Sequence, residues 1–156
     1  MTHLTETRWT HVALPVRDLD RSIAFYEAVT PLVLVRRNED NLGRGAWLSH
    51  EGQVDPPFIL VLAEFGPKLA DRFDIESDVD IPILQHFGHL GIEVPNREDV
   101  DAAAAQGREM HGLAWEPMDM GDYIGYTTAI KDPDGNTIEF AHKQAVYDTI
   151  QELWGT

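Results

Sequence analysis

Two stretches of this chain follow the same pattern, and together they decide its fold. Residues 10–28 read "THVALPVRDLDRSIAFYEA", and residues 88–106 read "GHLGIEVPNREDVDAAAAQ". Each stretch has a histidine near its start, then a strand whose apolar residues share one face, then a polar break and a helical segment. His11 and His89 occupy equivalent positions, 78 residues apart. A fixed offset of this kind indicates an internal duplication.

The same offset relates the last strands of the two halves. Residues 131–140 read "KDPDGNTIEF", in which an Asp-Gly turn leads into a short strand that contains Glu139. Subtracting 78 brings Glu139 into register with Val61, in the middle of the apolar segment "FILVLAEF" at 58–65. Each half therefore reads as a strand, a helix and three further strands. We predict an α+β fold made of two βαβββ modules.

The predicted elements divide the chain into modules and connections. We expect one domain over 1–156, with modules at 8–65 and 87–142, a connection at 66–86 and a C-terminal helix at 143–156. Strands are predicted at 9–16, 32–37, 45–50, 58–65, 87–94, 113–117, 124–131 and 137–142, and helices at 20–29 and 97–106. Gly107 is the expected stop of the second helix.

An apolar stripe of Val146, Ile150 and Leu153 follows one face of the predicted C-terminal helix. Such a stripe should pack on its own domain, contact a dimer partner or close over the site.

Composition excludes several classes of function. The chain has 43% hydrophobic and 25% charged residues, which is ordinary for a globular domain. Its 27 acidic and 12 basic residues give a net charge of −15, which opposes nucleic-acid binding and could attract a cationic ligand. No apolar run is long enough to span a membrane, and no signal peptide is apparent, so we expect a cytoplasmic protein. The absence of cysteine excludes disulfides and thiolate chemistry.

Three polar residues interrupt the apolar pattern at matching places. His11 and His89 lie on the two first strands, Glu139 lies on the last strand, and each faces away from the apolar neighbours that mark the packed side. If the two sheets curl together, all three side chains could point into one cleft. Two imidazoles and one carboxylate form a metal site with open positions, as in non-haem Fe(II) enzymes, and they also suit Zn²⁺, Mn²⁺, Ni²⁺ or Co²⁺.

The chain resembles the vicinal oxygen chelate superfamily. That superfamily includes glyoxalase I, extradiol dioxygenases, methylmalonyl-CoA epimerase, fosfomycin-resistance enzymes and bleomycin-resistance proteins. The resemblance covers roughly residues 8–142 and rests on "HVALPVRDLDRSIAFYE", "GHLGIEV" and "DPDGNTIEF". It implies paired βαβββ modules around a cleft, a homodimer, and metal ligation by His11, His89 and Glu139.

Two departures from the family pattern bear on the reaction. Glyoxalase-like members carry a fourth metal ligand, commonly Glu, at the position that is Val61 here. Extradiol dioxygenases carry a catalytic Tyr ten residues before the Glu, where this chain has Ala129. Fosfomycin-resistance enzymes share the ligand set, but their phosphonate-binding residues find no match. No general acid or base is identified.

The resemblance implies a metal-dependent enzyme that acts on a small organic substrate through its vicinal oxygens. The ligand set favours Fe²⁺ and a non-haem dioxygenase, with a glyoxalase-like lyase or isomerase as the next choice. The alternative is a metal-free protein of the bleomycin-resistance type that sequesters a cationic ligand, a role that the acidic charge would suit.

Overall fold

The computed structural model describes residues 10–54, 58–72, 84 and 88–154. The chain divides into two compact units, Met1–Pro82 and Ile83–Thr156, and each holds one four-stranded sheet. The predicted α+β fold of two βαβββ modules is confirmed. Within the described residues, no helix is long and apolar enough to cross a membrane.

The first unit is built on a sheet with strand order β1-β4-β3-β2. Its elements are β1 (Val12–Pro15), α1 (Leu19–Val29), β2 (Leu32–Asp40), β3 (Gly43–His50) and β4 (Ile59–Phe65). Strands β1 and β4 run parallel, and the other neighbours run antiparallel.

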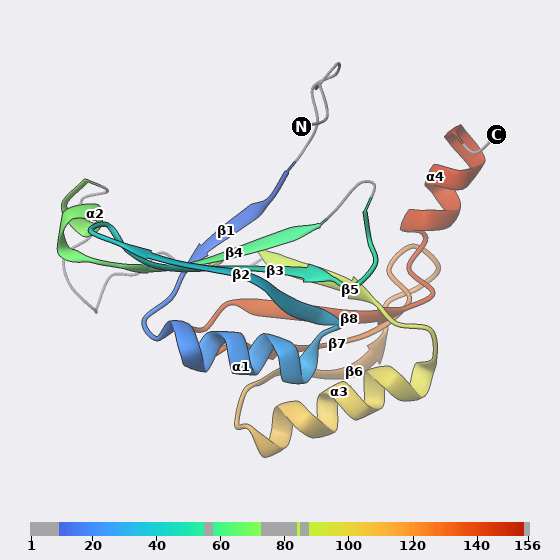
Figure 1. Cartoon of the computed structure of the whole chain (residues 1–156). Coiled ribbons are helices and arrows are strands. Elements are labelled where there is room, and N and C mark those ends of the chain that lie inside the picture. The colour runs from blue at the N-terminus through green and yellow to red at the C-terminus, as the bar shows by residue number, and fades with distance from the viewer. Residues whose placement is uncertain (1–9, 55–57, 73–83, 85–87, 155–156) are drawn as a thin grey trace. The chain divides into compact units, whose positions relative to one another are not determined.

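Helix α1 begins and ends where its flanking residues can satisfy free backbone groups. The Arg21 amide donates to Asp18 Oδ1 at 3.0 Å, and the Thr30 amide closes the last turn on Tyr26 O at 3.0 Å. The buried face of α1 includes Leu19, Ile23 and Tyr26, and the helix contacts β2, β3 and β4 (Figure 1). Helix α1 therefore covers one face of the sheet.

The second unit repeats this plan with strand order β5-β8-β7-β6. Its elements are β5 (His89–Glu93), α3 (Arg97–Glu109), β6 (Leu113–Asp119), β7 (Tyr126–Lys131), β8 (Thr137–His142) and α4 (Val146–Trp154). Helix α3 covers one face of the sheet (Figure 1) and contacts β6, β7 and β8.

Gly107 does not stop α3 as predicted, because the helix continues to Glu109. A Cβ at Gly107 would lie 2.4 Å from the Ile130 Cγ2 atom. The glycine is therefore explained by close packing of α3 on β7, and the chain turns only at His111, whose φ is 55°.

The strand registers confirm the 78-residue offset. Val61 pairs with Ala13 in the first sheet, and Glu139 pairs with Gly91 in the second. Both pairs join the first and last strands of a module in parallel. Positions 61 and 139 therefore occupy equivalent backbone places in the two units.

Two segments depart from expectation. The predicted connection at 66–86 begins with a short helix, α2 (Pro67–Arg72), and 73–83 and 85–87 lie outside the described residues. None of the described residues of α4 is buried, and Leu153 and Trp154 are 65% and 74% exposed. The apolar stripe on α4 is thus uncovered by the described part of the chain.

Candidate functional site

The turn before β8 fixes where Glu139 lies. Asp132 Oδ1 accepts hydrogen bonds from the amides of Asp134 and Asn136 at 2.9 and 2.8 Å. Its Oδ2 atom accepts a third bond from Asn136 Nδ2 at 2.8 Å. Gly135 adopts a φ of 101°, a backbone conformation that favours glycine. Since this turn is closed on itself, β8 starts in one register and Glu139 cannot slip to the other face.

Glu139 is a buried carboxylate on the face of the second sheet that α3 does not cover. It is 5% exposed, whereas its neighbours Ile138 and Phe140 belong to the apolar core under the helix. A buried carboxylate is costly unless it is paired or coordinates a cation. Its surroundings therefore have to supply donors or a metal.

His89 is the imidazole that Glu139 faces. The His89 Nε2 atom lies 3.9 Å from Glu139 Oε2, and the histidine side chain is 28% exposed. Two ligands of one metal ion, each bound at about 2.1 Å, stand about 3 Å or slightly more from each other. The separation is close to that value, so a small adjustment of either side chain lets both bind one ion. The structure thus brings together two of the three predicted ligands.

Small residues flank Glu139 on both neighbouring strands. Gly91 pairs with it on β5, and Ala129 pairs with it on β7. A Cβ added at Gly91 would meet no atom within 4 Å. The space beside the carboxylate and the imidazole is therefore open, as a site for a metal and a substrate oxygen requires.

Gln144 contacts the site although no sequence pattern pointed to it. Its Nε2 atom donates to Glu139 Oε1 at 3.2 Å. Lys143, with a φ of 60°, reverses the chain after β8 and so brings Gln144 back to a residue five positions earlier. No periodic pattern predicts such a contact, because it depends on a single left-handed residue.

His11 belongs to the first unit and precedes β1. It is exposed, and its Nδ1 atom lies 2.9 Å from Thr10 Oγ1. Among the residues that the structure describes, no group of three or more His, Asp or Glu side chains forms a cluster suited to a metal ion. His11 therefore remains a predicted ligand, whereas His89 and Glu139 are observed as a pair.

Other polar candidates face the helix side of the second sheet. The Tyr126 hydroxyl donates to Asp101 Oδ1 at 2.7 Å, and this hydrogen bond, with burial, raises the pKa of the phenol. His142 Nδ1 lies 3.3 Å from Val94 O. Both arrangements agree with the strand alternation, which turns these residues away from Glu139.

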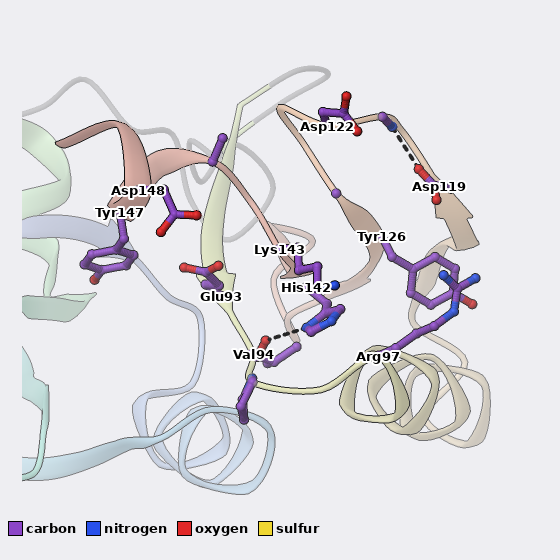
Figure 2. A pocket seen from close by; sticks show the side chains of 14 residues that line it. Glu93, Val94, Arg97, Asp119, Asp122, Tyr126, His142, Lys143, Tyr147 and Asp148 are labelled. Carbon is purple, nitrogen blue, oxygen red and sulfur yellow. Dashed lines mark hydrogen bonds between the residues drawn. The ribbon is translucent and has the colours of Figure 1, made fainter. Parts of the chain in front are cut away.

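A separate cavity of about 1020 Å³ lies at the far end of the second sheet (Figure 2). Its lining includes Glu93, Arg97, Tyr126, Lys143 and Asp148, but neither His89 nor Glu139. Arg97 stacks on the Tyr126 ring, with its guanidinium carbon 3.5 Å from the centroid. The lining mixes both signs of charge, so this cavity selects no ligand class by its electrostatics.

The fold and the sequence together place the chain in a known family. Residues 8–140 match the Glyoxalase/Bleomycin resistance protein/Dioxygenase superfamily. The chain belongs to this superfamily.

Curated relatives cover most of the chain. An uncharacterized protein of Pseudomonas aeruginosa is 31% identical over 135 residues, which are 86% of this chain and 88% of that protein. A lactoylglutathione lyase of Neisseria meningitidis is 28% identical over 144 residues, which are 92% of this chain and 96% of the lyase.

Solved structures share the fold at low sequence identity. The trypanothione-dependent glyoxalase I of Leishmania major aligns with a TM-score of 0.66 and 20% identity, covering 97% of this chain and all of that one. A variant of the fosfomycin resistance protein FosX from Listeria monocytogenes, complexed with Mn(II), aligns with a TM-score of 0.65 and 12% identity. The alignment covers 94% of this chain and 99% of that one. The antibiotic-binding protein TnmS3 from a Streptomyces species aligns with a TM-score of 0.59 and 22% identity. The alignment covers 90% of this chain and 98% of that one.

Proposed function

We propose that this protein is a metal-dependent enzyme that acts on a small organic substrate able to chelate a metal through neighbouring oxygens. The observation that carries the proposal is the pair of His89 Nε2 and Glu139 Oε2. These atoms lie 3.9 Å apart on the face of the second sheet that α3 does not cover. A buried carboxylate beside an imidazole, with open space next to it, is a suitable half of a divalent-metal site. The relative named as a lyase and the FosX complex with Mn(II) support the same reading.

The proposed ligands are His11, His89 and Glu139, and Fe²⁺ is the favoured ion, with Zn²⁺, Mn²⁺, Ni²⁺ and Co²⁺ as alternatives. A bound divalent ion would act as a Lewis acid toward substrate oxygens. Glu139 contributes the negative charge that the ion needs, and Gln144 holds the carboxylate oxygen that does not face His89. Gly91 leaves room beside the ligands for the substrate.

Two reaction types fit this ligand set. A dioxygenase is favoured by two histidines and one carboxylate with Val61 at the fourth position, because a valine leaves that position open. A glyoxalase-like lyase or isomerase is favoured by the relative named lactoylglutathione lyase, but it would need a base from elsewhere than Val61. The ligand-sequestering alternative is favoured by the likeness to TnmS3 and by the charge of −15.

Metal content is the measurement that tests the proposal. We expect protein purified without oxygen to hold about one divalent ion per chain, and His11→Ala, His89→Ala and Glu139→Ala each to lose most of it. His142→Ala is the matched control, since this histidine lies on β8 and contacts Val94 O on the other face. The control should keep its metal.

Glu139→Gln separates metal ligation from packing, because it keeps the size of the side chain and removes its charge. Metal-loaded parent should melt at a higher temperature than the Gln variant, and the difference should vanish once both are stripped of metal. Parent protein that binds no divalent ion, or unchanged metal content in two of the three alanine variants, contradicts the site. In that case the ligand-sequestering function becomes the better proposal.

A further inference from the structure

On the face of the first sheet that α1 does not cover, one row of residues differs in chemistry from the equivalent row of the second sheet. Arg36, Trp47 and Val61 stand next to one another on β2, β3 and β4 in direct register. The corresponding row of the second sheet is Trp115, Ala129 and Glu139. The first row therefore has an apolar residue in place of the carboxylate and a cation at its end.

This row lies in a cavity of about 470 Å³ whose described lining residues all belong to the first unit. Its lining includes Arg36, Asn38, Gly45, Trp47, Val61 and Ala63. Val61 and Ala63 alternate along β4 with Leu60 and Leu62, which are fully buried on the helix side. The floor of the cavity is thus apolar, and it presents the face of the sheet that α1 leaves free.

Trp47 gives the cavity an accessible aromatic surface. It is 41% exposed although it lies in the middle of β3, between the fully buried Ala46 and Leu48. The Arg36 guanidinium carbon lies 5.3 Å from the centroid of the Trp47 ring. A stacked guanidinium loses less freedom when it binds an anion, because the ring already restrains it.

Among the described residues, no carboxylate pairs with Arg36. Its neighbour Arg37 donates to Asp20 Oδ1 at 2.6 Å, and Arg44 is held by both Asp20 and Glu64. Asp40, also in the cavity lining, already accepts the Leu42 amide at 2.7 Å. Arg36 is therefore available to an anion from outside.

Asn38 adds a neutral hydrogen-bonding group on the same face. It pairs with Gly45 in the register of β2 and β3. A Cβ at Gly45 would lie 2.8 Å from Asn38 Oδ1, so the glycine makes room for the amide to cross over β3. Within the described part of the chain, the Asn38 side chain has no hydrogen-bond partner.

We infer that this cavity binds a small planar carboxylate, such as an aromatic or conjugated acid. The guanidinium of Arg36 can hold a carboxylate through two parallel N–H donors, which a neutral ligand cannot exploit. The exposed part of Trp47 and the apolar floor at Val61 favour a flat ring over a saturated one. The described residues that line the site all belong to the first unit. Val61 also stands where glyoxalase-like members carry a fourth metal ligand, but the inference does not need a bound metal.

Benzoate is the probe that tests this site, in full-length protein whose metal has been stripped and whose chelator has been dialysed away. Binding is followed by NMR through the indole N–H signal of Trp47, assigned with Trp47→Phe among the four tryptophans. We expect benzoate to shift this signal with saturation, and benzamide and cyclohexanecarboxylate to bind at least several-fold more weakly. Arg36→Gln should weaken benzoate binding about ten- to a hundredfold, the size expected when a hydrogen bond to a charged group is lost.

Arg21→Gln is the matched control, since it removes the same charge from an exposed position on α1 outside the cavity. It should leave benzoate binding unchanged, and melting curves should show that both variants stay folded. Equal binding of benzoate and benzamide, or equal losses in the two variants, overturns the inference. Because no metal is present, a failed metal site would leave this outcome unaffected.

Discussion

Position 139 shows how a single residue gives the two halves different chemistry. Glu139 pairs with Gly91, and Val61 pairs with Ala13 in the same register. The two residues therefore occupy equivalent backbone positions in the two sheets. Valine makes the first place apolar, whereas glutamate makes the second a candidate metal ligand. A carboxylate that is 5% exposed needs partners, and His89 and Gln144 are those that the structure supplies.

Gln144 should act as a positioning residue for Glu139. Outer partners of metal ligands typically affect metal affinity about 10- to 100-fold. We therefore expect Gln144→Ala to weaken binding of Mn²⁺ or Fe²⁺ by about tenfold, measured by calorimetry, with little change in the melting temperature of the metal-free protein. Gln144→Glu should lower the melting temperature of the metal-free protein, because two carboxylates would then face each other, and added metal should restore it.

Gln53→Ala is the control for this prediction, since Gln53 is exposed and its backbone amide, rather than its side chain, donates to His50 O. Gln144→Ala with unaltered metal affinity would mean that Glu139 does not depend on its amide donor.

At the scale of elements, one carboxylate joins a helix to two strands in the first unit. Glu64 on β4 accepts the Leu19 amide at 2.8 Å, at the start of α1. The same side chain accepts from Arg44 on β3 at 3.0 and 2.5 Å. The Arg44 guanidinium is the main reason that the pKa of Glu64 lies below its ordinary value of 4.5, and the Leu19 amide lowers it further. These contacts link α1 to the edge of the cavity that contains Arg36.

The lowered pKa of Glu64 predicts how stability changes in acid. A carboxyl whose pKa is depressed in the folded state contributes stability above its unfolded pKa, and the contribution is lost as the pH falls through the folded value. Glu64→Gln should cost about 1–2 kcal/mol at pH 7, and the gap to the parent should close as the pH falls below 4.5.

Thermal unfolding between pH 7 and pH 3 measures this effect. Glu51→Gln, at an exposed position outside these contacts, should melt like the parent throughout. A Glu64→Gln variant that stayed equally far below the parent at every pH would assign the loss to packing rather than to charge.

At the scale of the whole molecule, net charge and the exposed helix α4 oppose each other. A charge of −15 repels a second copy of the chain, whereas the uncovered stripe of Val146, Ile150 and Leu153 favours burial. We propose that the protein is a homodimer and that α4 takes part in the contact.

Two changes should shift the proposed dimer in opposite directions. Raising the salt concentration shortens the Debye length from about 10 Å at 0.1 M to about 3 Å at 1 M, so association should strengthen. Leu153→Glu adds a charge to the stripe and should shift the protein toward monomer. Gln151→Glu adds the same charge to α4 outside the stripe and should do so far less. Sedimentation velocity measures both, and a parent that is monomeric at all salt concentrations contradicts the proposal.

The sequence alone was sufficient to predict the duplicated fold and the register of its strands. Strand alternation and turn residues such as those at 132–136 act locally, so each leaves a recognisable pattern in the sequence. The predicted correspondence between Val61 and Glu139 was confirmed because strand register is strongly constrained. A slip by one residue would move the apolar side chains of the strand out of the core. Gly107 was misread, since its role is set by contact with Ile130 and not by its neighbours in the chain.

Only the tertiary structure decided which partners the functional groups meet. The contact of Gln144 with Glu139 depends on a left-handed Lys143, and the distance between His89 and Glu139 depends on the parallel pairing of β5 with β8. The stacking of Arg36 on Trp47 likewise depends on the bulged pairing of β2 with β3. Such contacts join residues distant in the chain, where no periodicity links them. The sequence pattern determines which face of a strand a side chain occupies, and tertiary packing determines which residues that side chain contacts.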